Sequence, residues 1–113
     1  MNPAQERKLD RMFQERVMDL HERQSLMGGD ATVVHHFHGR RHKSTRWLIS
    51  NGIPLTHDQH MAVHDNPDAK KRLESVMASS WLKDLEKRKN VIAKYIDYNT
   101  VVEHLNGKIE YYV

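Results

Sequence analysis

Residues 33–64, VVHHFHGRRHKSTRWLISNGIPLTHDQHMAVH, contain the features that decide the expected fold of this chain. Two short apolar segments, 32–34 and 53–55, favour β-strands, and the basic stretch between them is too polar for a core. Asn51 and Gly52 predict a tight turn ahead of the second strand. Thr56 or Asp58 can cap a short helix after that strand. The stretch therefore predicts two paired strands, joined by a long basic loop and followed by a helix.

Histidine is concentrated in this same stretch. Seven of the nine histidines lie between His35 and His64, and histidine is the side chain of metal ligation and of proton transfer near neutral pH. His60 and His64 are four positions apart, so a helix places both imidazoles on one face, where they can share a metal ion. His35 and His36 are neighbours on a strand and therefore point to opposite faces. One of them can join the helical pair at a metal while the other faces the substrate.

The order and spacing of these residues resemble a known family. His35-His36, Asn51, His60 and His64, separated by fourteen, eight and three residues, are similar to the HNH (ββα-metal) nuclease motif. The spacing is closest to that of the DNase domains of nuclease colicins. The segments HHFHGR (35–40) and IPL (53–55) also resemble phage-encoded HNH nucleases linked to recombination. The resemblance implies an α+β fold in which a hairpin and a helix form a ββα-metal core over residues 31–66.

The resemblance also implies a role for each residue of the motif. His35, His60 and His64 would hold one divalent metal ion, His36 would be the general base, and Asn51 would hold the strands in register across the loop. A three-histidine set is softer than a set with a carboxylate, so Zn²⁺, Mn²⁺ or Ni²⁺ fits as well as Mg²⁺. The implied activity is the hydrolysis of phosphodiester bonds in DNA by an endonuclease.

The basic loop is the expected DNA contact. Its cationic residues are Arg40, Arg41, Lys43 and Arg46. No acidic residue lies between Phe37 and His57, so ion pairs within the loop are not expected to occupy them. We predict contacts with backbone phosphates, which position a duplex without reading its sequence; the alternative is a solvated run of charge.

Three further histidines, His38, His42 and His57, are expected at the loop surface or at DNA and not in the metal set. His57 is a substitute ligand if the helix begins elsewhere.

The flanking segments are expected to be mostly helical. Residues 1–28 predict an N-terminal helix with apolar residues at helical spacing, which Gly28 and Gly29 end. This helix packs on the core or, alternatively, forms a homodimer. In the C-terminal segment, 67–113, Asn66 and Pro67 predict the start of one helix, and residues 81–96 predict another. Asn106-Gly107, between two apolar segments, predicts a final β-hairpin over 101–112.

Composition limits the class of protein. The 113 residues are the length of a single domain, 1–113, and the absence of cysteine excludes disulfides and thiolate metal sites. The net charge of +3 is a mild basic bias that is compatible with nucleic acid. No apolar run approaches the ~20 residues of a membrane span, and the charged N-terminus does not resemble a signal peptide. We expect a cytoplasmic protein without a membrane partner, in the host cytoplasm if a phage encodes it.

Three functions stay open at this point. The first is the metal-dependent HNH endonuclease. The second is a non-catalytic, metal-containing module that binds DNA. Such a module would not need the proposed base, His36. The third is a small helical interaction protein, whose fold would not change when metal is removed.

Overall fold

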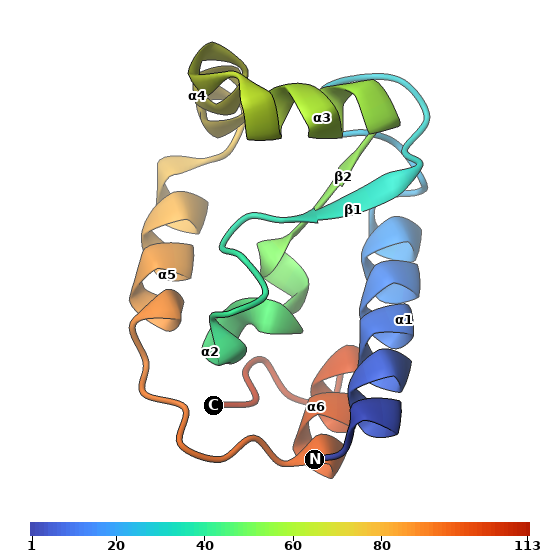
Figure 1. Ribbon diagram of the computed structural model, residues 1–113, viewed down its shortest axis with the longest axis vertical. Helices are drawn as coiled ribbons and strands as arrows, with labels where there is room; N and C mark the ends of the chain where they lie inside the picture. The colour runs from blue at the N-terminus through green and yellow to red at the C-terminus, as the bar shows by residue number, and fades with distance from the viewer.

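Two short antiparallel strands form the centre of the molecule. In the computed structural model, which describes residues 1–113, β1 (Val33–His36) pairs with β2 (Gly52–Leu55) (Figure 1). His35 lies opposite Ile53, and His36 lies opposite Gly52. The prediction of two paired strands joined by a long connection is therefore confirmed.

Helices surround this pair of strands and give the α+β class that the sequence predicts. In chain order they are α1 (Pro3–Leu20), α2 (Lys43–Arg46), the 3₁₀ helix η1 (Ile49–Asn51), α3 (His57–Asp65), α4 (Pro67–Ser75), α5 (Ser79–Lys89) and α6 (Tyr98–Leu105). None of them combines the length and the apolar character that crossing a bilayer requires.

The two strands lie between two helical flanks, and α3 lies across one end of the molecule (Figure 1). Helix α1 packs along both strands and against α6, whereas α5 contacts α2 and η1 on the other side of the molecule (Figure 1). Helix α3 contacts β1 and α4. The two strands and α3 are thus adjacent, and both flanks contact elements within residues 33–65.

Helix starts follow the capping signals in the sequence. The Thr56 hydroxyl accepts a hydrogen bond from the N–H of Gln59, whose side chain accepts one from the N–H of Thr56, so α3 begins with a complete capping box. Asn66 caps α4 and Pro67 occupies its first turn. These contacts confirm the predicted starts of both helices.

The core joins α1 to the strands and to the C-terminal helices. It includes Leu9, Phe13, Val17, Trp47, Leu48, Ile53, Leu55, Leu73, Leu85, Val101, Leu105 and Tyr112. At Gly52 the approach is so close that an added Cβ would lie 2.6 Å from Cγ2 of Val17 and 2.8 Å from Cζ of Phe13. Only glycine fits there, because side chains of α1 rest directly on the backbone of β2. The apolar stripe of α1 is therefore buried within the chain.

Helix α1 ends at Leu20, and the prediction that helix extends to about residue 27 is wrong. Glu22 and Arg23 have positive φ angles of 54° and 57°, which no helix accommodates. The N–H of Arg23 donates to the carbonyl of Met18, and its guanidinium pairs with Asp19 and Glu15 at 3.3 and 3.2 Å. Glutamate and arginine rarely adopt this conformation, so the sequence contains no signal for the stop.

The basic connection contains a helix where we predicted only a loop. Residues Lys43–Arg46 form α2, and Thr45 and Arg46 are buried. The Tyr112 hydroxyl donates to the carbonyl of Lys43 and accepts from the N–H of Trp47, so the C-terminal segment holds both ends of this turn. Asn51-Gly52 is not a tight turn either: Asn51 ends η1, and Gly52 begins β2. Both differences arise from contacts with residues distant in sequence.

The C-terminal hairpin prediction is wrong. Tyr98–Leu105 is helical because Asp97 caps its first turn, accepting a hydrogen bond from the N–H of Thr100 at 3.0 Å. Gly107, with φ of 78°, follows the end of this helix instead of forming a type I′ turn. Helix α5 also ends early, at Lys89, and the predicted helical residues 90–96 form an irregular connection.

Candidate metal centre

Three histidines converge beside β1. His35 from β1 and His60 and His64 from α3 each offer a ring nitrogen, and these nitrogens lie within 4.8 Å of one another. The Nε2 atoms of His60 and His64 are 3.0 Å apart, and the His35 ring lies 5.2 Å from each of their rings between centroids. His35 is buried, His60 half-buried and His64 exposed, so the set opens to solvent on one side. Three imidazole nitrogens at this separation suit one divalent metal ion.

Local structure explains why these three side chains meet. The capping box at Thr56 fixes the start of α3, and the four-residue spacing then places His60 and His64 on one face, one turn apart. Strand β1 contacts α3, and His35 is the β1 side chain that points toward the helix. The geometry predicted from the residue spacing is therefore present for these three residues.

His36 lies on the opposite side of the strand, as alternation requires. Its ring stacks on Phe13 of α1, with 4.8 Å between centroids and 25° between planes. Burial, followed by the positive charge of Arg40, lowers the pKa of His36 to about 4, although Asp10 opposes this shift. The imidazole is therefore neutral at pH 7. Phe13 is a residue of this site that sequence reasoning assigned only to helix packing.

A cavity connects His36 with the three-histidine set. It has a volume of about 330 Å³ and is lined by Val34, His35, His36, Gly39, Arg40, His60 and His64. A ligand in this cavity would touch the candidate metal ligands and His36 together. Burial, followed by the charges of neighbouring histidines and Lys70, lowers the pKa of His35 to about 4, which keeps its nitrogen free to bind a cation.

Asn51 is fully buried and does not line this cavity. Its side chain accepts a hydrogen bond from the N–H of His38 and donates one to the His38 carbonyl. This contact ties the residues that follow β1 to the residue that precedes β2. Asn51 therefore holds the connection between the strands, which agrees with a positioning role.

The basic connection is more occupied by ion pairs than the sequence suggested. Asp10 of α1 binds Arg40 at 2.7 Å and Arg46 at 3.0 Å, and it accepts a hydrogen bond from the Trp47 indole at 2.8 Å. Burial alone would raise the pKa of Asp10, but these partners lower it below its ordinary value, so the carboxylate is charged. No ion pair forms within the connection, as expected, but three of its four basic residues are still paired, because carboxylates of α1 reach them.

The four basic residues accordingly differ in their surroundings. Arg46 is buried, with its guanidinium 4.7 Å from the centroid of the Trp47 ring, so its environment is that of a core residue. Lys43 pairs with Glu6 at 3.2 Å. Arg41 is exposed and has no acidic partner, and Arg40 lines the histidine cavity while bound to Asp10. Arg40, Arg41 and Lys43 are exposed, and of these only Arg40 lines the histidine cavity.

The extra histidines stay outside the three-histidine set. His57 is exposed at the start of α3. His38 lies 3.7 Å from the carboxylate of Glu86 and 6.2 Å from the His42 ring between centroids, near α5.

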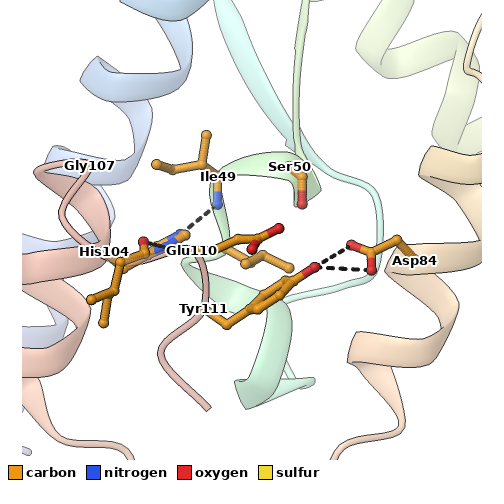
Figure 2. Close-up of a pocket in the computed structure, with 9 residues that line it drawn as sticks. Ile49, Ser50, Asp84, His104, Gly107, Glu110 and Tyr111 are labelled. Carbon is orange, nitrogen blue, oxygen red and sulfur yellow. Dashed lines mark hydrogen bonds between the residues drawn. The ribbon is translucent and has the colours of Figure 1, made fainter.

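A second pocket lies between η1 and the C-terminal segment (Figure 2). Three of its polar side chains are already paired: the Tyr111 hydroxyl donates to the carboxylate of Asp84 at 3.1 Å, and Nε2 of His104 accepts from the N–H of Ile49 at 3.0 Å (Figure 2). These contacts attach the C-terminal segment to η1 and α5. The pocket is therefore explained by the packing of the chain end.

Comparison of the chain with protein-family models, curated proteins and solved structures finds no match. The residues of the site and their geometry are thus the basis for interpreting its chemistry.

Proposed function

We propose that this protein is a metal-dependent endonuclease of the HNH (ββα-metal) type that hydrolyses phosphodiester bonds in DNA. The observation that carries the proposal is the cavity shared by His36 and by the cluster of His35, His60 and His64. A binding module would need the cluster alone. A neutral, half-buried imidazole beside the cluster is instead an arrangement that suits a hydrolytic reaction.

The three-histidine set fits a divalent cation because its nitrogens are close together, one is buried and two share a helix face. When bound there, such an ion supplies Lewis-acid stabilisation of the negative charge that develops on the phosphate and on the departing 3′ oxygen. The chain's contribution is to hold His35, His60 and His64 in one place, with their rings oriented by β1 and α3.

His36 is the general base in this proposal. At pH 7 its imidazole is neutral and can accept the proton of the attacking water. A bound phosphate would raise the pKa of His36, because negative charge stabilises the imidazolium form. Stacking on Phe13 fixes the plane of the ring, so its nitrogens keep one direction as the proton transfers. The products are a 5′-phosphate and a 3′-hydroxyl.

The decisive experiment is the cleavage of supercoiled plasmid by the purified chain with Mg²⁺, Mn²⁺, Ni²⁺ or Zn²⁺, and with EDTA as the control. We expect cleavage with at least one ion and none with EDTA. Retained DNA binding without cleavage under every condition would instead support the non-catalytic, metal-containing DNA-binding module.

A further inference from the structure

The histidine site continues beyond its cavity toward α4. A neighbouring hollow is lined by His35, His36, Phe37, Gly39, Val63, His64 and Lys70. It shares four of these residues, His35, His36, Gly39 and His64, with the cavity that ends at Arg40. The two hollows thus form one trough across the site, with Arg40 toward α1 at one end and Lys70 of α4 at the other.

The position of Lys70 is set by the packing of α4. Asn66 caps the helix, and Ala69 and Leu73 are buried in the core at 3% and 0% exposure. Lys70 follows Ala69 directly and is exposed, so its stem leaves the helix at the edge of the trough. The next residue, Lys71, is also exposed but does not line either hollow.

Electrostatics distinguish this lysine from an ordinary surface charge. Lys70 has no carboxylate partner within ion-pair distance, whereas Arg40 is held by Asp10. Burial lowers the pKa values of His35 and His38 most, and the charge of Lys70 adds the smallest of the contributions to each. Neither hollow is lined by aspartate or glutamate. A cation next to a candidate metal site opposes metal binding but attracts an anion that binds there.

We propose that Lys70 binds a substrate phosphate next to the scissile one, on the α4 side of the site. Arg40 binds a phosphate on the opposite, α1 side. The nucleic-acid strand therefore runs along the trough from α4 to α1 and passes the three histidines and His36 in between. This inference rests on the proposed function and adds to it the path of the substrate and a residue that the sequence motif does not include.

The first test compares Lys70→Ala with Lys71→Ala, a matched control on the same helix. Lys70→Ala should raise KM for a short DNA duplex and lower the slope of log K against log salt by about 0.9, the value for one lost phosphate contact. Lys71→Ala should leave both unchanged, and Lys70→Arg should restore them. Lys71→Ala should cleave a small phosphodiester that lacks flanking phosphates, bis(p-nitrophenyl) phosphate, like the wild type, and at saturating metal Lys70→Ala should change this cleavage less than it changes cleavage of the duplex.

Metal titration separates a substrate contact from a structural role. Removing a positive charge near the site should leave the affinity for Mn²⁺ or Zn²⁺ unchanged or increase it. Weaker metal binding by Lys70→Ala would mean that the lysine supports the site itself, and it would overturn the inference.

Substrates with single neutral methylphosphonate linkages locate the contact. A neutral linkage at the phosphate that Lys70 contacts should weaken cleavage by the wild type but should not weaken cleavage by Lys70→Ala any further. A neutral linkage at a different phosphate should likewise weaken cleavage by the wild type but not by Arg40→Ala. If Lys70→Ala and Lys71→Ala behave alike while the wild type cuts DNA, the inference is wrong and the proposed function stands. If the wild type neither cuts nor binds DNA with any of the four metals, the proposed function is wrong and the inference with it.

Discussion

The side chain of Asn51 is paired with the backbone of His38 in both directions. The N–H of His38 donates to Oδ1 of Asn51 at 2.9 Å, and Nδ2 of Asn51 donates to the His38 carbonyl at 3.0 Å. The backbone carbonyl of Asn51 also accepts from the N–H of Phe37 at 2.9 Å. The start and the end of the connection between β1 and β2 are thus fastened at one buried side chain.

Asn51→Ala should therefore destabilise the protein by about 2–4 kcal/mol, because it leaves two backbone groups of His38 without partners. Urea denaturation measures this loss. The control is Asn106→Ala, at an exposed position after α6, which should change stability by about 0.5 kcal/mol or less. An unchanged urea midpoint for Asn51→Ala would show that the pairing contributes little.

His36→Ala should reduce DNA cleavage by roughly 10²–10⁴-fold, the usual contribution of a general base. Metal and DNA affinity should remain close to wild type, because His36 points away from the three-histidine cluster. Rates under single-turnover conditions, with His57→Ala as the control, provide the measurement. A parallel loss of metal affinity would assign His36 as a ligand and contradict its role as base.

His60→Ala and His64→Ala should each weaken metal binding and remove the stabilisation that metal provides. A ligand at a hundredfold excess over its dissociation constant stabilises the folded state by about 2.7 kcal/mol. EDTA should therefore lower the melting temperature of the wild type and of His57→Ala. It should lower the melting temperatures of His60→Ala and His64→Ala by less. Equal melting temperatures of the wild type in both conditions would argue against a metal site coupled to folding.

Arginine substitutions in the connection should separate two roles. Arg40→Ala combined with Arg41→Ala should weaken binding to unrelated DNA sequences alike and lower the salt slope by about 0.9 for each lost contact. Arg46→Ala should instead lower stability, because Arg46 is buried between Asp10 and the Trp47 ring. Salt titrations and urea denaturation of the same proteins test both statements. If the double variant keeps its salt slope, Arg40 and Arg41 do not contact phosphate; if it loses affinity for one sequence only, they read bases.

His104 should make stability depend on pH. Its Nε2 accepts a hydrogen bond from Ile49, its Nδ1 lies 3.1 Å from the Ile109 carbonyl, and the residue is buried. Burial lowers the pKa of His104, although the backbone carbonyls of Ile109 and Glu110 oppose this effect. The unfolded chain therefore binds a proton more readily below pH ~6.5, and the free energy of unfolding falls as pH decreases, by at most about 1.4 kcal/mol per pH unit.

Glutamine offers an acceptor and a donor without titrating, so His104→Gln should show a shallower loss of stability than the wild type between pH 7 and 5. Urea denaturation at several pH values measures the difference. Identical slopes in the two proteins would exclude a contribution from His104.

The sequence predicted the elements whose signals are local. Alternation along β1, the capping residues Thr56 and Asn66 and the spacing of His60 and His64 depend on neighbouring residues, and each was found where expected. The wrong predictions involve distant partners. Tyr112, near the end of the chain, donates a hydrogen bond to the first residue of α2. Asp10, on α1, binds two arginines of the connection between the strands. Val101–Leu105 suits a strand by composition but is helical because Asp97 caps it and because Val101 and Leu105 pack into the core.

The contacts of α1 bear on how this motif could be transplanted. Phe13 stacks on His36, Asp10 orients Arg40, and the side chains around Gly52 leave no room for a Cβ. The two strands and α3 alone would lose the ring behind His36 and the anchor of Arg40, while exposing the apolar surface of β2 to water. A graft of residues 31–66 into another scaffold would thus carry the three imidazoles of the candidate metal site without the ring that holds His36 in place. A graft that keeps this arrangement must therefore include α1, or the host scaffold must supply an equivalent helix.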